Sequence, residues 1–257
     1  MASNYRPQRV RNIFDPSSNQ VYKISRSKLD LFIKCPRCFY LDRRLGVSQP
    51  PGYPFTLNNA VDALLKKEFD YYRQRQEPHP LITKNNIDAI PYQHAQLEEW
   101  RDSLRRGIQF HILQTSILLT GGVDDVWIDV KTQELIIVDY KATSKAEQVS
   151  INADWQKGYK RQTEIYQWLF RKNGFPVSKV AYFVYCNGRT NGDRFDEQLL
   201  FDISLISYIG STEWIEPVIY KAYECLCSNE LPPHNQSCDY CQYILAVEDA
   251  IIRATTK

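Results

Sequence analysis

Alternating apolar and polar positions near the middle of the chain predict a β-hairpin. Residues 123–130 and 134–141 are rich in Val, Ile and Trp, and the polar segment Lys131-Thr132-Gln133 separates them. A two-residue turn and a four-residue loop give the same register, which places Asp124 directly across from Asp139. A three-residue loop would shift the register by one position and send the two carboxylates to opposite faces.

The second predicted strand carries acidic and basic side chains on one face. Its period of two places Asp139 and Lys141 on that face and Tyr140 on the other. Two facing carboxylates repel each other unless a proton or a cation lies between them, and a hard divalent ion is the natural occupant. Lys141 would then lie near metal-bound water, an arrangement suited to phosphodiester hydrolysis. The alternative is an ordinary cross-strand Asp–Lys ion pair, with Asp124 and Asp125 starting a turn.

Helical spacing of apolar residues predicts several helices around the hairpin. Ser25 or Ser27 can cap the first helix, and Pro36 interrupts it. The predicted order is a helix over about 25–44 with this interruption, helix 57–73, a helix around 93–109, strand 112–120, the hairpin, helix 154–172, strand 179–186, a strand near 195–203, helix 212–226 and a short last helix after residue 241.

The helices predicted before the hairpin carry charged residues of interest. Asp62 and Glu68 lie on the helix over 57–73, although most helix acids are simply solvated. The buried stripe of that helix is expected to consist of Val61, Leu64, Leu65, Phe69 and Tyr72. The polar side of the next helix either contacts phosphates or is solvated, and it carries Arg101, Arg105 and Arg106.

A stripe on the helix predicted over 154–172 contains one amide among largely apolar residues. Its members are Trp155, Tyr159, Gln162, Tyr166 and Leu169. A buried amide needs hydrogen-bond partners, so Gln162 is the anomaly. If this helix packs beside the carboxylate face of the hairpin, Gln162 and Tyr166 point into the site. Alternatively, Gln162 lies at a helix edge and hydrogen-bonds to backbone atoms.

The composition is that of a folded protein without an overall basic field. The chain has 257 residues, 43% hydrophobic and 24% charged, which is enough for one large domain. Its net charge of +2 means that only local patches could bind nucleic acid. The seventeen Tyr and five Trp suit packing against bases or sugars, and equally suit core-edge positions. Without a signal peptide or a long apolar run, we expect a soluble, cytoplasmic protein.

Three motifs in order resemble those of the PD-(D/E)XK nuclease superfamily, and more closely those of RecB-type nuclease domains and their CRISPR-associated relatives. The resemblance spans about residues 25–247. The motifs are Gly121 to Asp124, Asp139-Tyr140-Lys141 and Gln162 to Tyr166, with Ser27-Lys28-Leu29, Cys35-Pro36-Arg37 and Phe39-Tyr40-Leu41 as N-terminal support.

The resemblance implies an α/β fold with a restriction-endonuclease-like core, in which helices flank a mixed central sheet. Residues 1–20, which include Arg6, Arg9 and Arg11, are expected to form a flexible basic arm. The remainder is expected to be a single nuclease domain over 21–257, with a helical N-terminal part (21–110), a catalytic core (111–205) and a C-terminal helical and cysteine-containing segment (206–257).

The resemblance also implies a metal site. Asp124, Asp139 and the Tyr140 carbonyl are expected to bind Mg²⁺ or Mn²⁺. Relatives often place a metal-binding His on the second helix, and here the corresponding position is Asp62, whose carboxylate suits a hard ion as well as imidazole does. The alternative is that Asp62 is an exposed helix acid without a metal role.

Further residues receive their roles from the same resemblance. Lys141 is expected to position the attacking water. Gln162 and Tyr166 are expected to steady the lysine and the substrate strand near the scissile phosphate. The candidate nucleic-acid contacts are Arg43, Arg44, Lys160 and Arg161.

The cysteines match this family only in part. Its iron–sulfur members use one Cys in the N-terminal C-P-R segment and three in a terminal C-x₂-C-x₅-C. Cys35, Cys238 and Cys241 fit this pattern, but the last position is Val247. Cys38 could supply a fourth thiolate, and two C-x₂-C pairs suit a Cys₄ zinc site or a [4Fe–4S] cluster. The alternative is a relic whose thiols pack as small hydrophobic side chains.

Three functional interpretations follow. The first is a metal-dependent DNA nuclease, an exonuclease acting on single strands or DNA ends, in repair, recombination or CRISPR-type defence. The second is a catalytically silent nuclease-fold module that binds nucleic acid or a partner. The third is a structural protein held by a cysteine-bound metal. A protein partner within a larger nucleic-acid-processing complex is expected from the relatives, and no membrane association is expected.

Overall fold

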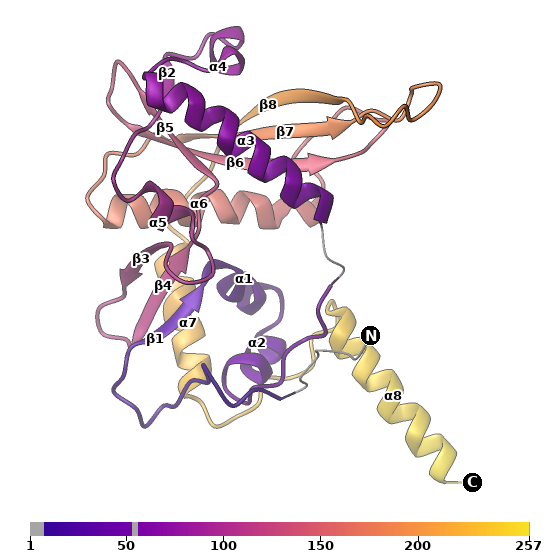
Figure 1. Cartoon of the computed structure of the whole chain (residues 1–257). Coiled ribbons are helices and arrows are strands. Elements are labelled where there is room, and N and C mark those ends of the chain that lie inside the picture. Colours follow the sequence, from indigo (N-terminus) through magenta and orange to yellow (C-terminus); the bar gives the residue numbers. More distant parts are fainter. Residues whose placement is uncertain (1–7, 53–55, 257) are drawn as a thin grey trace. The chain divides into compact units, whose positions relative to one another are not determined.

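The computed structural model describes residues 8–52 and 56–256 and divides into two compact units (Figure 1). Arg6 of the expected basic arm lies outside the described residues. Within the described ranges, no helix has both the length and the apolar character that a membrane crossing requires. Unit 1 combines Met1–Tyr53, His111–Leu119 and Glu213–Lys257, and unit 2 combines Pro54–Phe110 and Thr120–Thr212.

Unit 2 is built on a five-stranded mixed sheet, which confirms the predicted fold class. Strands β6 and β7 are parallel neighbours, and the other neighbouring pairs are antiparallel. A parallel pair needs a crossover connection, and helix α6 (Lys157–Lys172) lies within it. In sheet order the strands are β2 (Ala89–Pro91), β5 (Asp125–Asp129), β6 (Leu135–Thr143), β7 (Val180–Gly188) and β8 (Phe201–Ile209).

The β5–β6 hairpin has the predicted register. Asp125 pairs with Val138, and the four-residue loop 130–133 joins the two strands. Continuing this register by one residue places Asp124 opposite Asp139, although Asp124 itself lies just before β5. The local pattern of the hairpin was therefore sufficient to predict which carboxylates face each other.

Helices α3 (Thr56–Arg75) and α6 cover opposite faces of this sheet. Leu65 and Phe69 of α3 pack against Trp127, Val138 and Tyr140 in one buried cluster. The other face of β6 carries Asp139, which accepts a hydrogen bond from Gln162 of α6. The sheet thus lies between α3 and α6 (Figure 1), with the Asp139 side chain on the α6 side.

The predicted buried stripe of α3 is wrong at Leu64, which is 64% exposed. Val61 and Tyr72 are half-buried. Arg73 is buried there instead, because its guanidinium ion-pairs with Asp70 and Asp125. A charged side chain can be buried only when such partners neutralise it, and helical periodicity alone does not reveal them.

The helix predicted around 93–109 is also wrong over most of its length. Only α5 (Leu97–Arg101) is helical, and β3 (Ile108–His111) follows after a turn. Gly107 has a φ of +70°, and a Cβ there would lie 2.4 Å from the Gly121 carbonyl oxygen. A helix extending to residue 109 would not allow the positive φ and close backbone approach of Gly107.

The arginines of this segment also differ from the expected polar face. Arg101 is held within unit 2, where its guanidinium contacts Asp70 at 3.0 Å and Asp125 at 3.0 Å. Arg105 and Arg106 are exposed. Arg101 consequently stabilises the interior and is not a free phosphate contact.

Unit 1 gathers helices from both ends of the chain. Helices α1 and α2 both contact α7. Ser25 is the N-cap of α1, and Pro36 occupies the first turn of α2, as predicted. The helices are α1 (Arg26–Lys34), α2 (Pro36–Arg43), α7 (Ile215–Cys227) and α8 (Asp239–Thr255).

Several predicted boundaries shift in the structure. The strand expected over 112–120 is β4 (Ile117–Gly121), which lies between β1 (Tyr22–Ser25) and β3 in a three-stranded sheet. The strand expected near 195–203 is β8, which begins at Phe201. The last helix has 17 residues and is not short. Helix α4 (Pro80–Lys84) was not predicted.

Candidate functional site

Two carboxylates meet at the end of the β5–β6 hairpin in unit 2. Asp139 is fully buried on β6, and Asp124 is half-buried just before β5. The Tyr140 amide donates a hydrogen bond of 2.9 Å to Asp124 Oδ2, which fixes the Asp124 side chain against β6. In an antiparallel strand pair the amide and the carbonyl of one residue face the same neighbour, so the Tyr140 carbonyl faces the same edge as Asp124.

Lys141 completes the charge distribution on this face. Its ammonium forms an ion pair with Asp139. Burial and the neighbouring charge of Asp139 raise the pKa of Asp124 to about 6. Burial lowers the pKa of Lys141, but the charges of Asp139 and Asp124 outweigh burial and raise it. The lysine is therefore protonated, while the acid pair holds more negative charge than the lysine neutralises.

Helix α6 supplies the amide and the phenol of the predicted third motif. Gln162 is buried, and its Nε2 donates to Asp139 Oδ1 at 2.6 Å and to the Tyr166 hydroxyl at 3.2 Å. Gly121 is needed beside them, because a Cβ at this position would lie 2.5 Å from Cε1 of Tyr166. The structure thus gives a steric reason for glycine in the first motif. The catalytic roles of these residues stay predictions.

Lys66 of α3 is a site residue that the sequence reading missed. Its Nζ lies 2.7 Å from Asp62 Oδ2 and 4.0 Å from Asp124 Oδ1. Asp62 is thereby linked to the hairpin acids through a lysine. The spacing of four between Asp62 and Lys66 on a predicted helix was the available signal.

The acid site fits a hard divalent cation. Its donors are carboxylate oxygens and a strand-end carbonyl, which are the ligands that Mg²⁺ and Mn²⁺ prefer. Asp139 Oδ2 is buried, and its partner is the Lys141 ammonium, with which it forms an ion pair. Within the described residues, Asp62, Asp124 and Asp139 do not bring their carboxylate oxygens together into a three-ligand group.

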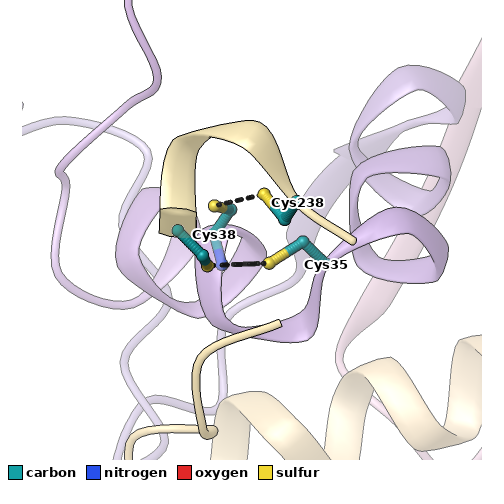
Figure 2. Close-up of side chains that lie close together, drawn as sticks. Cys35, Cys38 and Cys238 are labelled. Atoms are coloured by element: carbon teal, nitrogen blue, oxygen red, sulfur yellow. Dashed lines mark hydrogen bonds between the residues drawn. The ribbon is translucent and has the colours of Figure 1, made fainter. Parts of the chain in front are cut away.

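Four cysteines converge in unit 1 (Figure 2). Cys35 and Cys38 lie at the start of α2, and Cys238 and Cys241 lie at the start of α8. All four Sγ atoms lie within 4.8 Å of one another, and the separations Cys35–Cys241 and Cys38–Cys238 are both 3.6 Å. The structure thus brings together the two predicted C-x₂-C pairs from residues as far as 206 positions apart.

The surroundings of the cysteine cluster hold two of its thiols in the neutral form and favour the thiolate of a third. Burial raises the pKa of Cys35 to about 11 and raises the pKa of Cys38 even further. Burial also acts to raise the pKa of Cys238, but hydrogen bonds, the first from the Cys241 amide, outweigh it and lower that pKa. Because metal ligands must be deprotonated, binding a cation here would release protons.

The four candidate nucleic-acid contacts occupy different environments. Arg43 is buried, and its Nε donates to Asp42 at 3.0 Å, so its guanidinium is engaged within unit 1. Arg44 and Arg161 are half-buried. Lys160 Nζ lies 5.6 Å from the centre of the Tyr208 ring. Arg43 is the member of this set whose burial argues against contact with a substrate.

A family comparison accounts for this arrangement. The family model described as "PD-(D/E)XK nuclease superfamily" matches residues 23–245, a range that contains the acid pair, Lys141, Gln162 and all four clustered cysteines. The chain belongs to the PD-(D/E)XK nuclease superfamily. Membership indicates a nuclease, and nucleases of this superfamily usually use divalent metal ions.

The other comparisons add little to the family assignment. No curated protein matches the chain. A solved structure titled "Crystal structure of SSO0001" is 13% identical, with 89% of this chain and 86% of that chain covered, at a TM-score of 0.39. A similarity of this size carries no argument about activity.

Proposed function

We propose that this superfamily member is a Mg²⁺- or Mn²⁺-dependent deoxyribonuclease, an exonuclease that acts on single strands or DNA ends. The observation that supports the proposal is the arrangement on one face of β6, where Asp139, Lys141 and the facing Asp124 lie together. Gln162 adds a hydrogen bond of 2.6 Å that orients Asp139. A decayed site would not be expected to keep this set of contacts.

Each residue has a distinct task in the proposed hydrolysis. Asp124, Asp139 and the Tyr140 carbonyl would hold the divalent ion. When bound, such an ion polarises the scissile phosphate and acidifies a water molecule. Lys141, protonated between the carboxylates, donates hydrogen bonds that orient the attacking water in line with the leaving oxygen. Gln162 keeps Asp139 in its orientation throughout.

The proposal predicts metal-dependent cleavage. End-labelled single- and double-stranded DNA should be degraded with Mg²⁺ or Mn²⁺ and not with EDTA, and the product ladder would give the direction. Asp139→Ala should abolish cleavage, while Asp88→Ala, which removes an exposed carboxylate in the same unit, should not. No cleavage by the folded, metal-loaded protein would favour the binding module, or a nuclease that needs a partner.

The biological setting is part of the same proposal. RecB-type and CRISPR-associated relatives, which the motifs resemble, work in repair, recombination or defence, often within larger complexes. We propose such a process for this protein. Cleavage that appears only after addition of a co-purified protein partner would support a role as a subunit.

We also propose that the four cysteines bind one tetrahedral ion, zinc in particular. Zinc–sulfur bonds of about 2.3 Å place tetrahedral sulfurs roughly 3.7 Å apart. Two of the Sγ separations are 3.6 Å and all lie within 4.8 Å, which supports a single ion. A [4Fe–4S] cluster binds each cysteine to a different iron and so spreads the sulfurs further apart. One zinc per chain and no iron–sulfur absorbance are the expected results of elemental and spectroscopic analysis, and an iron-containing chromophore would reverse the choice.

A further inference from the structure

Unit 2 carries a series of lysine and aromatic side chains that extends away from the candidate site. Lys141 Nζ lies 4.5 Å from the centre of the Tyr159 ring, which lies 5.5 Å from the centre of the Trp155 ring. Lys145 Nζ lies 5.1 Å from the Trp155 ring. We call these four residues the aromatic track. The first two distances place the Trp155 ring at most about 10 Å from Lys141 Nζ.

Trp155 is an exposed aromatic side chain on a well-anchored turn. It is 57% exposed at the centre of the 3-10 turn η1 (Asp154–Gln156). The next residue, Gln156, is buried and accepts a 3.0 Å hydrogen bond from the Ala153 amide, while its Nε2 donates to the Ser150 carbonyl at 2.6 Å. The indole is therefore presented to solvent by a fixed backbone, so a ligand that covers it has little ordering cost to overcome.

The surroundings of Trp155 are basic. Lys145 is exposed, and its backbone is anchored by two hydrogen bonds to the Asn187 side chain, at 2.8 and 2.9 Å. Lys157 is exposed and is paired at 2.8 Å with Asp154, a solvent-screened pair that contributes little. Lys160 lies further along the same helix. An exposed indole among lysines matches the combination of stacked bases and neutralised phosphates that single-stranded nucleic acid requires.

We propose that the aromatic track binds a single-stranded nucleic acid, with Trp155 stacked on an unpaired base and Lys145 on an adjacent phosphate. In a duplex the faces of each base are covered by its neighbours, so a stacking platform selects unpaired nucleotides. At a rise of about 3.4 Å per nucleotide, the Trp155 ring lies within about three nucleotides of Lys141. This inference rests on the proposed nuclease function, because it gives that site its substrate class.

The test is base-dependent binding measured without cleavage. A fluorescent oligothymidine of about twelve nucleotides, an abasic strand of the same length and the corresponding duplex are titrated in EDTA. Trp155→Ala should weaken oligothymidine binding by about tenfold or more and leave abasic-strand binding unchanged. Trp155→Phe should retain most of the affinity. Lys145→Ala should weaken binding of both the oligothymidine and the abasic strand. A titration with oligouridine would show whether the protein prefers DNA or RNA.

Tyr71→Ala is the matched control, because Tyr71 is 52% exposed in the same unit and also carries a cation, Arg75, over its ring. The inference is overturned if wild-type protein binds no single strand, if Trp155→Ala binds normally, or if it loses the abasic strand equally. The nuclease proposal can fail separately. Base-dependent binding without cleavage in Mg²⁺ would contradict the nuclease proposal and support the aromatic track. Cleavage, together with normal strand binding by Trp155→Ala, would support the nuclease proposal and contradict the aromatic track.

Discussion

Asp124 and Asp125 are adjacent in the chain but lie in opposite environments. Asp125 lies on the apolar face of the sheet, where it accepts hydrogen bonds from the Tyr140 hydroxyl at 2.8 Å and from Arg101 at 3.0 Å. Asp124 lies on the other face with Asp139. The alternation of strand side chains thus separates a structural acid from a site acid. The sequence predicted the position of Asp124 but gave no indication of the role of Asp125.

The same change, Asp to Asn, is expected to have opposite effects on stability at these two positions. Asp124→Asn should abolish cleavage and raise the thermal stability of the metal-free protein at pH 7, because it removes a carboxylate whose pKa is raised to about 6 by burial and by the charge of Asp139. Asp125→Asn should destabilise unit 2 by about 3–5 kcal/mol, because it removes the fully buried carboxylate that Arg73 and Arg101 both contact and leaves Asp70 as the carboxylate that they share. Thermal melts with EDTA measure both. Equal stability of the two variants would contradict the assignment.

Lys141 gives a second prediction at this scale. Lys141→Ala should lower kcat for DNA cleavage by about 10²–10⁴-fold, because the attacking water loses its orienting donor. Binding of uncleavable DNA and the folded state should be largely retained. Lys131→Ala, which removes an exposed lysine from the loop of the same hairpin, is the control. Substantial residual activity would remove Lys141 from the mechanism.

Glycine at position 121 is required by its contact with Tyr166. Gly121→Ala should lower stability by about 1–3 kcal/mol, because the new methyl group overlaps the Tyr166 ring. It should also reduce cleavage, since Tyr166 accepts a hydrogen bond from Gln162. Gly174→Ala is a useful comparison, because that site is sterically open and strained only by its φ of +86°. A Gly121→Ala protein with normal melting and activity would contradict the steric argument.

Helices and strands whose hydrophobic pattern lies within one short stretch of sequence were predicted well. The hairpin has its own turn, so its register follows from about twenty residues. Helix α6 was also predicted, because its apolar stripe repeats over 16 residues. By contrast, the segment 93–109 has helical periodicity but is interrupted where Gly107 meets Gly121. Contacts between distant segments decide such boundaries, and local periodicity does not contain them.

The start of α8 depends on the cysteine cluster. Cys238→Ser should strip the bound metal and lower the melting temperature by roughly 5 °C or more, because metal binding would hold α2 and α8 together. Cleavage chemistry should be affected only through stability. Cys225→Ser changes a thiol outside the cluster and should leave metal content unchanged. Normal metal content in Cys238→Ser would exclude the four-cysteine site.

At the scale of the whole molecule, the chain is divided into two units, and each unit combines segments that are separated in the sequence. Unit 1 contains the N-terminal and C-terminal segments together with His111–Leu119. Within it, the fully buried Asp42 carboxylate contacts Lys28 at 2.7 Å and Arg9 at 2.8 Å. Arg9 belongs to the segment expected to form a loose arm, and here it has a buried partner.

Asp42 predicts how stability depends on pH. Burial raises its pKa, but hydrogen bonds from Arg43, Lys28 and Ser48 outweigh burial and hold the pKa well below the ordinary value. Its contribution is therefore present above about pH 4 and lost as the pH falls below that value. Asp42→Asn should lower the melting temperature at pH 7 and flatten its dependence on pH below 4. Asp249→Asn, at an exposed helix acid, should do neither.

The sequence by itself determined the nuclease family and the hairpin register in which Asp124 faces Asp139, and it predicted the two C-x₂-C pairs that converge in unit 1. These features depend on local periodicity and on short motifs with fixed spacing. Only the tertiary structure decided that Lys66 joins Asp62 to Asp124, that Asp125 is neutralised by two arginines, and that Gln162 contacts Asp139. Such contacts join residues far apart in sequence, and their energies depend on burial and on neighbouring charges that no local pattern records.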